Sequence, residues 1–504
     1  MLPLLTRAAA READRHAIEG MGVPGVVLME SAGRGAFEVI AREHAASLER
    51  VLLVGGPGQN GGDAWVVARH LARVGHTPRA LLVVPDGELG HLAGDARINW
   101  HVLAPLGIAT TVIAPEQQDV LADALRSATL VVDGVFGTGL ARDVSGAWAA
   151  VLLAMNAALV PKVALDLPSG VDADTGAVLG TAIHATTTIT FGAHKRGLVQ
   201  RPGRTHAGRV WVADIGVPVG RDAPDHVLEA ADLRVLVPPR TPDAHKGSAG
   251  HVAIVGGDAG KTGAAFLAGL GALRGGAGLV TLVAPEGGRA VLEHKTVELM
   301  TATLPQDQEA AQRLLADKRA LVVGPGLGFS PPARALVTEL LPRLAPPCVL
   351  DADALTLLAE SAGGLAELRS AAGPRVLTPH PGEAARLLGV DTASVQAGRY
   401  ASVEALAARS GQVVVLKGEG TLVAQAGRGL CVCTHGTPAM GTGGTGDVLA
   451  GLIGALLASG IPAFEAACAG VLLHALAGER AATGDRGLLA SELAHAVPKV
   501  LAER

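Results

Sequence analysis

Aromatic residues are scarce in this sequence, and neither sign of charge is in large excess. Aromatic residues make up 2% of the chain, which argues against a surface that stacks on nucleic-acid bases. A net charge of -5 argues against a broad phosphate-binding surface. Hydrophobic residues nevertheless reach 49%, a globular composition whose core must be built from Ala, Val and Leu. We therefore expect a folded protein with small-molecule substrates and no nucleic-acid partner.

Cysteines and long uninterrupted apolar runs are also few. The 4 cysteines are too few for a disulfide framework in 504 residues, which favours a reducing, cytoplasmic location. Cys431 and Cys433 form a C-x-C pair without a partner cluster, so we interpret them as strand residues rather than metal ligands. The N-terminal MLPLLTRAAAREADRHA lacks the apolar stretch of an export signal. Residues 448–478 are interrupted by Pro462 and Glu465, which predicts buried helices rather than a membrane span.

Short apolar runs alternate with segments of helical length in two successive series. The first series contains VLLVGG, RALLVVP, ATLVVDGVFG and KVALDLPSG, which begin at residues 51, 79, 128 and 162. The second starts with HVAIVGG at residue 251 and continues through GLVTLVAP, ALVVGPG, CVLDADAL, RVLTPHPGE and VVVLKGEG. Buried parallel strands joined by helices give this rhythm. A Pro-rich, charged stretch separates the series, so we predict two α/β domains, 1–225 and 235–504, with a boundary near residue 230.

The motif GTPAMGTGGTGD, residues 436–447, is a glycine-rich loop that ends on an acid. The following VLAGLIGALLASG predicts a helix. A glycine loop at a helix N-terminus is an anion site, because free N–H groups and the helix dipole both face the ligand. Asp447 is then either a partner of the dipole or, beside a phosphoryl donor, a base for an attacking hydroxyl. The second arrangement is that of an alcohol kinase.

Other polar loops follow the predicted strands of the second half. GPGLG, TPHPGE and KGEGT could each be a tight turn, but together with TGGTGD they indicate one ligand site, because ligands collect at the carboxyl ends of parallel strands. GDAGKTGAA at residue 257 lacks the spacing of a phosphate-binding P-loop. Glu383 in TPHPGE could order a magnesium ion through water or could cap a helix start.

The first half carries a second candidate cradle in VLLVGGPGQNGGDAWVVARHLARVGH. It has a strand, a glycine-rich loop and a helix, but it departs from the dinucleotide fingerprint G-x-G-x-x-G. Asp133 and Asp166 each stand at the end of a predicted strand. Both could be site acids or simply loop caps.

The second half is similar to the ribokinase-like superfamily, and within it to the ADP- or ATP-dependent NAD(P)H-hydrate dehydratases. The resemblance rests on HKGSAGHVAIVGG, GKTGAAFLAG, VVGPGLG, LDADAL, LTPHPGEAARLLG, VLKGEGTLV and GTPAMGTGGTGDVLAG. Sugar kinases of the superfamily usually have an asparagine near the place of His380, so the substrate is expected not to be a sugar.

The resemblance implies a repair reaction on hydrated NADH or NADPH, in which phosphate transfer to the ring hydroxyl precedes elimination. Asp447 is the implied base, magnesium is near Glu383, and ADP is favoured over ATP as the donor. His380 either contacts the hydrate or is a structural turn residue. The implied hydrate pocket is lined by Ala264, Gly326, His380 and Asp447. The implied nucleotide site comprises Lys417, Gly418, Glu419, Gly420, Thr421, Gly443, Gly444, Thr445 and Gly446.

The first half resembles the NAD(P)H-hydrate epimerase domain through LMESAGR, GPGQNGGDAWVVARHL, DGVFGTGL, DLPSGVDADTG and TFGAHKRGL. It implies proton transfer by Asp166, and a role for Lys195 unless that residue is a solvated loop lysine. The family often has asparagine at the place of Ser31. The implied potassium ligands are Asn60, Asp133 and Ser169, oxygen donors that suit a hard cation. The implied hydrate site comprises Gln59, Asn60, Gly61, Gly62, Asp63, Gly137, Thr138, Gly139, Leu140, Ala141, Arg142, Asp143 and Asp166.

Together the resemblances imply an N-terminal Rossmann-like three-layer αβα domain and a C-terminal ribokinase-like αβα domain. The implied enzyme is bifunctional: one domain interconverts the R and S hydrates, and the other dehydrates the S form. A homo-oligomer without membrane partners is expected. The alternative is a ribokinase-like kinase of a vitamin precursor, fused to a non-catalytic Rossmann-like binding module.

Overall fold

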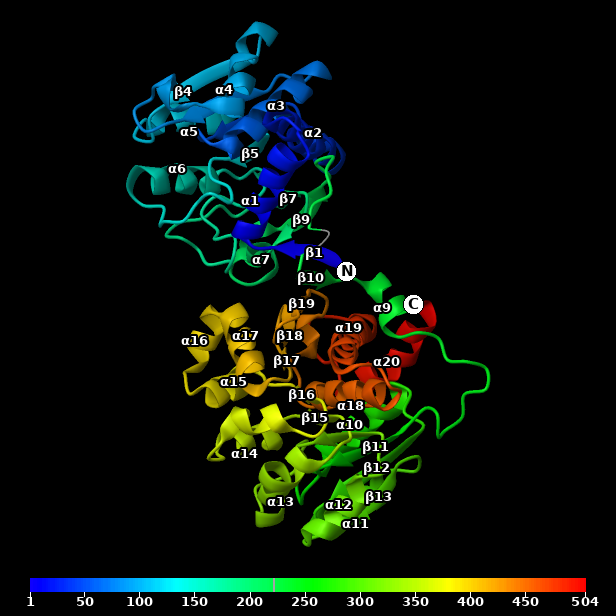
Figure 1. Cartoon of the computed structure of the whole chain (residues 1–504). Helices are drawn as coiled ribbons and strands as arrows, with labels where there is room; N and C mark the ends of the chain where they lie inside the picture. Colours follow the sequence, from blue (N-terminus) through cyan, green and yellow to red (C-terminus); the bar gives the residue numbers. More distant parts are fainter. Residues whose placement is uncertain (221–222) are drawn as a thin grey trace. The chain divides into compact units, whose positions relative to one another are not determined.

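The computed structural model describes residues 1–220 and 223–504 (Figure 1). These residues divide into two compact units. The first unit is Leu2–Asp225, and the second comprises His226–Arg504 together with Met1. The Pro-rich stretch between the two series of strands contains β10 (Asp225–Leu228) and α9 (Leu233–Leu236), two elements that its sequence did not indicate.

The first unit is built on a 7-stranded sheet in the order β4-β3-β2-β5-β6-β7-β9, and every neighbouring pair is parallel. Four of its strands were predicted from apolar runs, and all four are confirmed. The order reverses between β2 and β5, so the loops that follow these strands diverge and open a crevice. The strands are β2 (Val51–Gly55), β3 (Arg79–Val83), β4 (Ala109–Ile113), β5 (Leu130–Gly134), β6 (Lys162–Leu165), β7 (Thr187–Phe191) and β9 (Arg209–Ala213).

Helices cover both faces of this sheet. In β2, Leu53 belongs to the core formed with α2, α3 and α4, whereas Leu52 belongs to the core formed with α5 and α6. This alternation is the period of two that a strand buried on both faces requires. Ser31 fits within α2 by donating its hydroxyl to the carbonyl of Val27 at 3.0 Å. The helices are α2 (Gly25–Glu43), α3 (Gln59–Arg73), α4 (Gly94–His101), α5 (Gln118–Ser127) and α6 (Gly146–Ala157).

Smaller elements complete the first unit. The strand β1 (Leu2–Leu5) pairs in parallel with β8 (His194–Lys195), and α1 (Arg7–Arg15) follows it. Two short helices, α7 (Arg196–Val199) and α8 (Gly203–Ala207), come next along the chain after β8.

The sheet of the second unit runs β13-β12-β11-β14-β15-β16-β17-β18-β19-β10. Neighbours from β13 to β17 are parallel, whereas β18 and β19 form antiparallel pairs, and β10 joins β19 in parallel. The six predicted strands of this half are confirmed, and Cys431 and Cys433 are strand residues of β19, as predicted. The strands are β11 (His251–Val255), β12 (Leu279–Ala284), β13 (Met300–Thr303), β14 (Ala320–Val323), β15 (Cys348–Leu350), β16 (Arg375–Leu377), β17 (Val413–Leu416), β18 (Thr421–Gln425) and β19 (Gly429–Cys433).

Much of the core on this sheet comes from four helices: α10 (Thr262–Arg274), α18 (Thr445–Ala458), α19 (Ala463–Ala481) and α20 (Ala490–Glu503). The helix predicted after GTPAMGTGGTGD is therefore confirmed. Its small residues serve close packing, because a Cβ on Gly451 would lie 1.9 Å from the carbonyl oxygen of Ala268. The helices α10 and α18 thus approach backbone to backbone.

The remaining helices of the second unit are shorter. Figure 1 shows α14 to α17 on the opposite side of the sheet from α19 and α20. These helices are α11 (Glu286–Lys295), α12 (Gln308–Leu315), α13 (Pro331–Ala335), α14 (Asp353–Ala359), α15 (Pro381–Leu388), α16 (Thr392–Ala397) and α17 (Arg399–Ser410).

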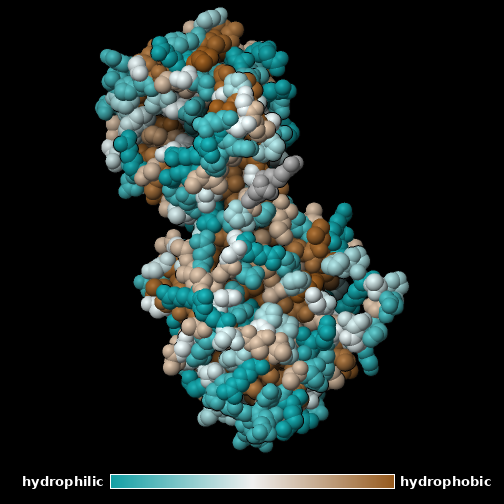
Figure 2. Space-filling model, in the orientation of Figure 1, coloured by the Kyte–Doolittle hydropathy of each residue, from teal (hydrophilic) through white to brown (hydrophobic). Residues whose placement is uncertain are grey.

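The surface of the displayed face is mixed in polarity. Figure 2 shows hydrophilic and hydrophobic residues interspersed over each unit on this face. Among the described residues, none of the helices combines the length and apolarity needed to cross a bilayer.

Candidate active sites

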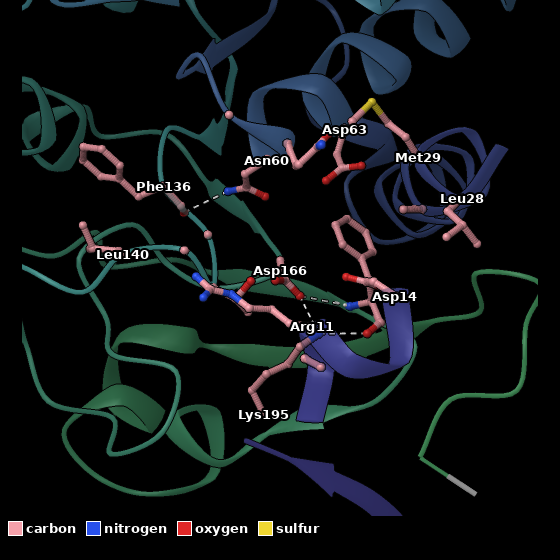
Figure 3. Close-up of a pocket in the computed structure, with 18 of the residues that line it drawn as sticks. Arg11, Asp14, Leu28, Met29, Asn60, Asp63, Phe136, Leu140, Asp166 and Lys195 are labelled. Atoms are coloured by element: carbon pink, nitrogen blue, oxygen red, sulfur yellow. Dashed lines mark hydrogen bonds and ion pairs between the residues drawn. The ribbon is translucent and has the colours of Figure 1, made fainter. Parts of the chain in front are cut away.

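The first unit contains a cavity of about 810 Å³ at the carboxyl ends of β2, β5 and β6 (Figure 3). This volume is within the range of small-molecule sites. Of the predicted hydrate residues, Gly61, Gly62 and Asp143 do not line the cavity. The predicted residues that do line it are Gln59, Asn60, Asp63, Gly137, Thr138, Gly139, Leu140, Ala141, Arg142 and Asp166. The topological switch point between β2 and β5 therefore gathers most of this set.

The predicted potassium ligands lie together beside this cavity. The hydroxyl of Ser169 donates to Asp133 Oδ1 at 2.6 Å, and its backbone N–H donates to Oδ2 at 2.8 Å. The amide nitrogen of Asn60 donates to the carbonyl of Phe136 at 2.9 Å, while its buried Oδ1 has no hydrogen-bond partner among the described residues. Burial raises the pKa of Asp133 to about 6. Asn60 and Ser169 both hydrogen-bond the carbonyl of Phe136, so the buried carboxylate and the orphaned amide oxygen belong to one hydrogen-bonded cluster, a donor set that suits a hard cation.

Asp133 also has the alternative role considered for it, because its Oδ1 accepts from the N–H of Val135 at 3.2 Å and so caps the strand end. Capping and cation binding are compatible, since a carboxylate oxygen has more than one lone pair.

Asp166 directly follows β6 and forms a buried ion pair. Its Oδ1 accepts from Lys195 Nζ at 2.5 Å and from the hydroxyl of Thr190 at 3.2 Å. Lys195 is 3% exposed, so its interpretation as a solvated loop lysine is wrong. Asp166 has φ of 60°, a strained value for a residue with a side chain, and such strain concentrates at functional sites.

Three further acids line this cavity, namely Asp14, Asp63 and Asp95. Asp63, on α3, was predicted, but Asp14, on α1, was not. The helix α1 is fixed by Arg7, whose N–H donates to Asp174 at 2.6 Å and whose guanidinium pairs with Asp172 at 2.5 Å. Burial raises the pKa of Asp14, and burial with the nearby acids raises the pKa of Asp63 well above its ordinary value. No local sequence signal marks Asp14, because its neighbours in the cavity come from distant segments.

In the second unit, the loops after β11 and β14 bind each other at the switch point of the sheet. The N–H of Asp258 donates to the carbonyl of Gly326 at 2.7 Å. The N–H of Ala264 donates to the carbonyl of Lys261 at 3.2 Å, and a Cβ on Gly326 would lie 2.5 Å from the same oxygen. Ala264 and Gly326, both predicted to line the hydrate pocket, therefore flank one loop.

A lysine and several acids surround the start of α18. Lys417 Nζ donates to Asp351 Oδ1 at 2.7 Å and lies 3.9 Å from Glu383 Oε2. Burial and the charge of Asp351 raise the pKa of Asp447 to about 7, and Lys417 opposes this shift. Asp447, Lys417 and Glu383 were singled out from the sequence, but Asp351 was only part of a quoted strand motif. The positive φ of 49° at Ala352, next to Asp351, was a local feature that sequence could not reveal.

His380 and Glu383 cap α15. His380 Nδ1 accepts from the N–H of Gly382 at 3.0 Å, and Glu383 Oε2 accepts from the N–H of His380 at 2.8 Å. Both residues therefore have the structural roles considered as alternatives, a turn histidine and a helix-start cap. The side chain of His380 is 56% exposed, and its other nitrogen, Nε2, lies 3.5 Å from Glu383 Oε1.

The predicted nucleotide segments approach each other. A Cβ on Gly446 would lie 3.5 Å from Lys417 Nζ, which brings the β17 loop to the glycine loop. The first intrahelical bond of α18 joins the N–H of Val448 to Gly444, so the amides before it are available to an anion. The loop is fixed by Thr445, whose hydroxyl donates to the carbonyls of Met440 and Thr442 at 3.1 Å.

A buried histidine supports this loop from α19. His474 Nε2 donates to the carbonyl of Thr445 at 2.8 Å. Burial lowers the pKa of His474 to about 4, so the ring is neutral near pH 7. His474 thereby fixes the first turn of α18 through the carbonyl of Thr445, while the backbone N–H groups of that turn point away from it.

The fold and these sites define a two-unit α/β enzyme whose second unit is ribokinase-like, with a glycine-rich loop before α18 and a buried aspartate, Asp447, in the first turn of that helix. Residues 252–499 match the family described as NAD(P)H-hydrate dehydratase, and residues 25–197 match the family described as YjeF-related protein N-terminus. The chain belongs to the family of bifunctional NAD(P)H-hydrate repair enzymes.

Relatives over the whole length support this assignment. The chain is 41% identical to the bifunctional NAD(P)H-hydrate repair enzyme Nnr of Moorella thermoacetica, over 99% of this chain and 96% of the relative. It is 36% identical to the Escherichia coli enzyme of the same name, over 97% and 92%. The crystal structure of the ADP/ATP-dependent NAD(P)H-hydrate dehydratase from Bacillus subtilis, co-crystallized with ATP/Mg2+, has a TM-score of 0.50 and 30% identity. This similarity covers 55% of our chain and 98% of the other. The predicted fold class is confirmed.

Proposed function

We propose that this chain repairs hydrated NADH and NADPH. The first unit interconverts the R and S epimers, and the second dehydrates the S form with ADP or ATP, which leaves AMP or ADP and phosphate. The observation that carries the proposal is the presence of both acid-bearing strand-end sites in a chain that aligns over its full length with bifunctional repair enzymes. The kinase alternative with a non-catalytic first unit does not account for that alignment.

In the second unit, Asp447 accepts the proton of the substrate hydroxyl as the phosphoryl group is transferred to that oxygen. A pKa of about 7 suits a general base at neutral pH. Phosphate is then the leaving group, and elimination restores the dihydronicotinamide ring. The amides at the start of α18, with Lys417, stabilise the transferred charge. We favour ADP over ATP as the donor.

Magnesium and potassium are proposed as bound ions. The carboxylates around Lys417 suit a divalent ion that Glu383 would bind through water, where it would neutralise phosphate charge. Asn60, Asp133 and Ser169 would bind potassium, and the orphaned Oδ1 of Asn60 fits that role. In the first unit, Asp166 is placed by Lys195 for proton transfer at the hydroxyl-bearing carbon.

The test uses purified R and S hydrates with each nucleotide in turn. Recovery of reduced-nicotinamide absorbance with equimolar free phosphate supports the proposal. A stable phosphorylated product without that absorbance refutes it in favour of a kinase. Asp447→Asn should stop dehydration and leave epimer interconversion intact, whereas Asp166→Ala should do the reverse.

We also propose a homo-oligomer in the cytoplasm, where the 4 free cysteines of the sequence would remain reduced. Light scattering during size-exclusion chromatography would measure the oligomeric state.

A further inference from the structure

Asp63 is a buried acid without an ion-pair partner among the residues that the structure describes. It lies in the first turns of α3, is 8% exposed, and lines the cavity. None of the described residues donates a hydrogen bond to its carboxyl or forms an ion pair with it. Figure 3 shows Asp63 projecting into the space that it shares with Asp14, Asp166 and Lys195. Buried carboxyls are almost always paired, so an unpartnered one that faces a cavity points to a ligand.

Asp166, on the other wall, has the opposite environment. The ammonium of Lys195 donates to it at 2.5 Å, and the N–H of Phe191 donates at 3.4 Å. These are the contacts of a carboxylate. No described residue donates to Asp63 in this way. Burial, with the charges of Asp166 and Asp14, favours its neutral form, and the more distant charge of Lys195 only opposes this effect. An ion-paired acid and an unpaired acid that face one cavity are the arrangement of a base and an acid.

Epimerisation of the hydrate needs such a pair. The reacting carbon carries a hydroxyl and is bonded to the ring nitrogen. When an acid protonates the hydroxyl, the C–O bond breaks, water leaves, and the nitrogen lone pair forms a C=N⁺ bond. Water then adds to the opposite face and gives its proton to a base, so atoms and charge balance without an oxidant or a metal.

We propose that Asp63 is the general acid of this step and works across the cavity from Asp166. The proposal rests on the proposed epimerase function and adds a role within it. Asp14 lines the same cavity and faces the space that Asp63 enters (Figure 3), so we assign it as a positioning residue whose negative charge favours the protonated form of Asp63. It lies on α1, outside the two segments that match family models, residues 25–197 and 252–499. The other charged residues that line the cavity are Arg11, Asp95, Arg142, Asp166 and Lys195.

The experiment follows conversion of the pure R hydrate to the S hydrate by chromatography, without nucleotide, so that dehydration is silent. Spontaneous interconversion is subtracted. General acids contribute about 100-fold or more, so Asp63→Asn should lower kcat by that factor with little change in KM. The native rate should fall at alkaline pH as Asp63 loses its proton, and the variant should lack this limb. Asp63→Glu should recover part of the rate, and Asp14→Asn should move the alkaline limb to lower pH.

Each part of the proposal has its own contradicting result. A kcat for Asp63→Asn within about threefold of native, or an unchanged alkaline limb, overturns the acid role. An unmoved limb in Asp14→Asn overturns the role of Asp14. Loss of folding is detected by tryptophan fluorescence, since all 4 tryptophans lie in the first unit. If the native chain does not interconvert epimers at all, the proposed function fails instead.

Discussion

Asp447→Asn should stabilise the second unit while it abolishes dehydration. Burial and neighbouring carboxylates raise the pKa of Asp447 from 3.8 to about 7. At 1.36 kcal/mol for each pH unit, the folded state loses roughly 4 kcal/mol when this group ionises. Because the pKa is raised on folding, stability falls as pH rises from about 4 to about 7 and is constant above that range. The neutral amide removes this penalty.

The free energy of unfolding should therefore differ little between native and variant at pH 4, and the variant should be more stable by up to about 4 kcal/mol at pH 8. Hydrogen exchange of peptides from α18 measures the second unit, whereas tryptophan fluorescence follows only the first unit and should not change. Glu309→Gln, an exposed acid on α12, is the matched control and should shift stability by less than about 0.5 kcal/mol.

Equal stability of native and Asp447→Asn at pH 8 would refute the reasoning, because it would mean that Asp447 is not held in a destabilising environment. The rate should follow the same group: kcat/KM for dehydration should rise with pH up to about 7 in the native chain.

Three further perturbations are predicted. Lys195→Met leaves the buried carboxyl group of Asp166 unpaired, so it should lower the free energy of unfolding by about 3–5 kcal/mol, measured by tryptophan fluorescence. The control Arg34→Met, on the exposed face of α2, should lower it by under about 1 kcal/mol, and equal effects would contradict a buried ion pair. Replacing potassium by lithium should slow epimerisation and lower the unfolding temperature of the first unit, and Asn60→Leu should remove this ion dependence. If the variant keeps the native ion dependence, Asn60 is not a potassium ligand. Gly444→Ala should destabilise α18, since φ is 95° and its Cβ would meet Leu267 at 2.4 Å, whereas Gly443→Ala has open space and should be tolerated; differential scanning calorimetry distinguishes the two.

The strands were predictable where apolar runs are buried on both faces, because that burial leaves a continuous signal in the sequence. Of the antiparallel hairpin, β19 was indicated only by the interpretation of Cys431 and Cys433 as strand residues, and β18 was missed, because its apolar run, residues 422–424, is short and the chain reverses after it. The strand β1 and the helix α1 were also missed. The helix α1 has no buried residue, so its sequence carries no apolar stripe.

The candidate sites were predictable where a loop follows a strand, because strand ends meet at one edge of the sheet. Interactions between distant segments were not predictable from the sequence. Lys417 and Asp351 are 66 residues apart, and Lys195 and Asp166 are 29 apart, so no spacing rule pairs them. Asp14 reaches its cavity on α1, which Arg7 docks on Asp172, a residue 165 positions away in the sequence.

The two sites use lysine in different ways, and this sets opposite pH dependences within one chain. Lys195 contacts Asp166 directly and, among the described residues, forms no ion pair with Asp63. If Asp63 is the acid proposed above, the first site requires its neutral form and slows as pH rises. Lys417 is bound to Asp351 and only moderates Asp447, so the second site requires an ionised base and slows as pH falls. One site therefore needs a protonated aspartate and the other an ionised aspartate. When repair starts from the R hydrate, the rate-limiting step should change with pH between epimerisation and dehydration. The S hydrate should accumulate in acid, where dehydration limits, and the R hydrate should persist in alkali, where epimerisation limits.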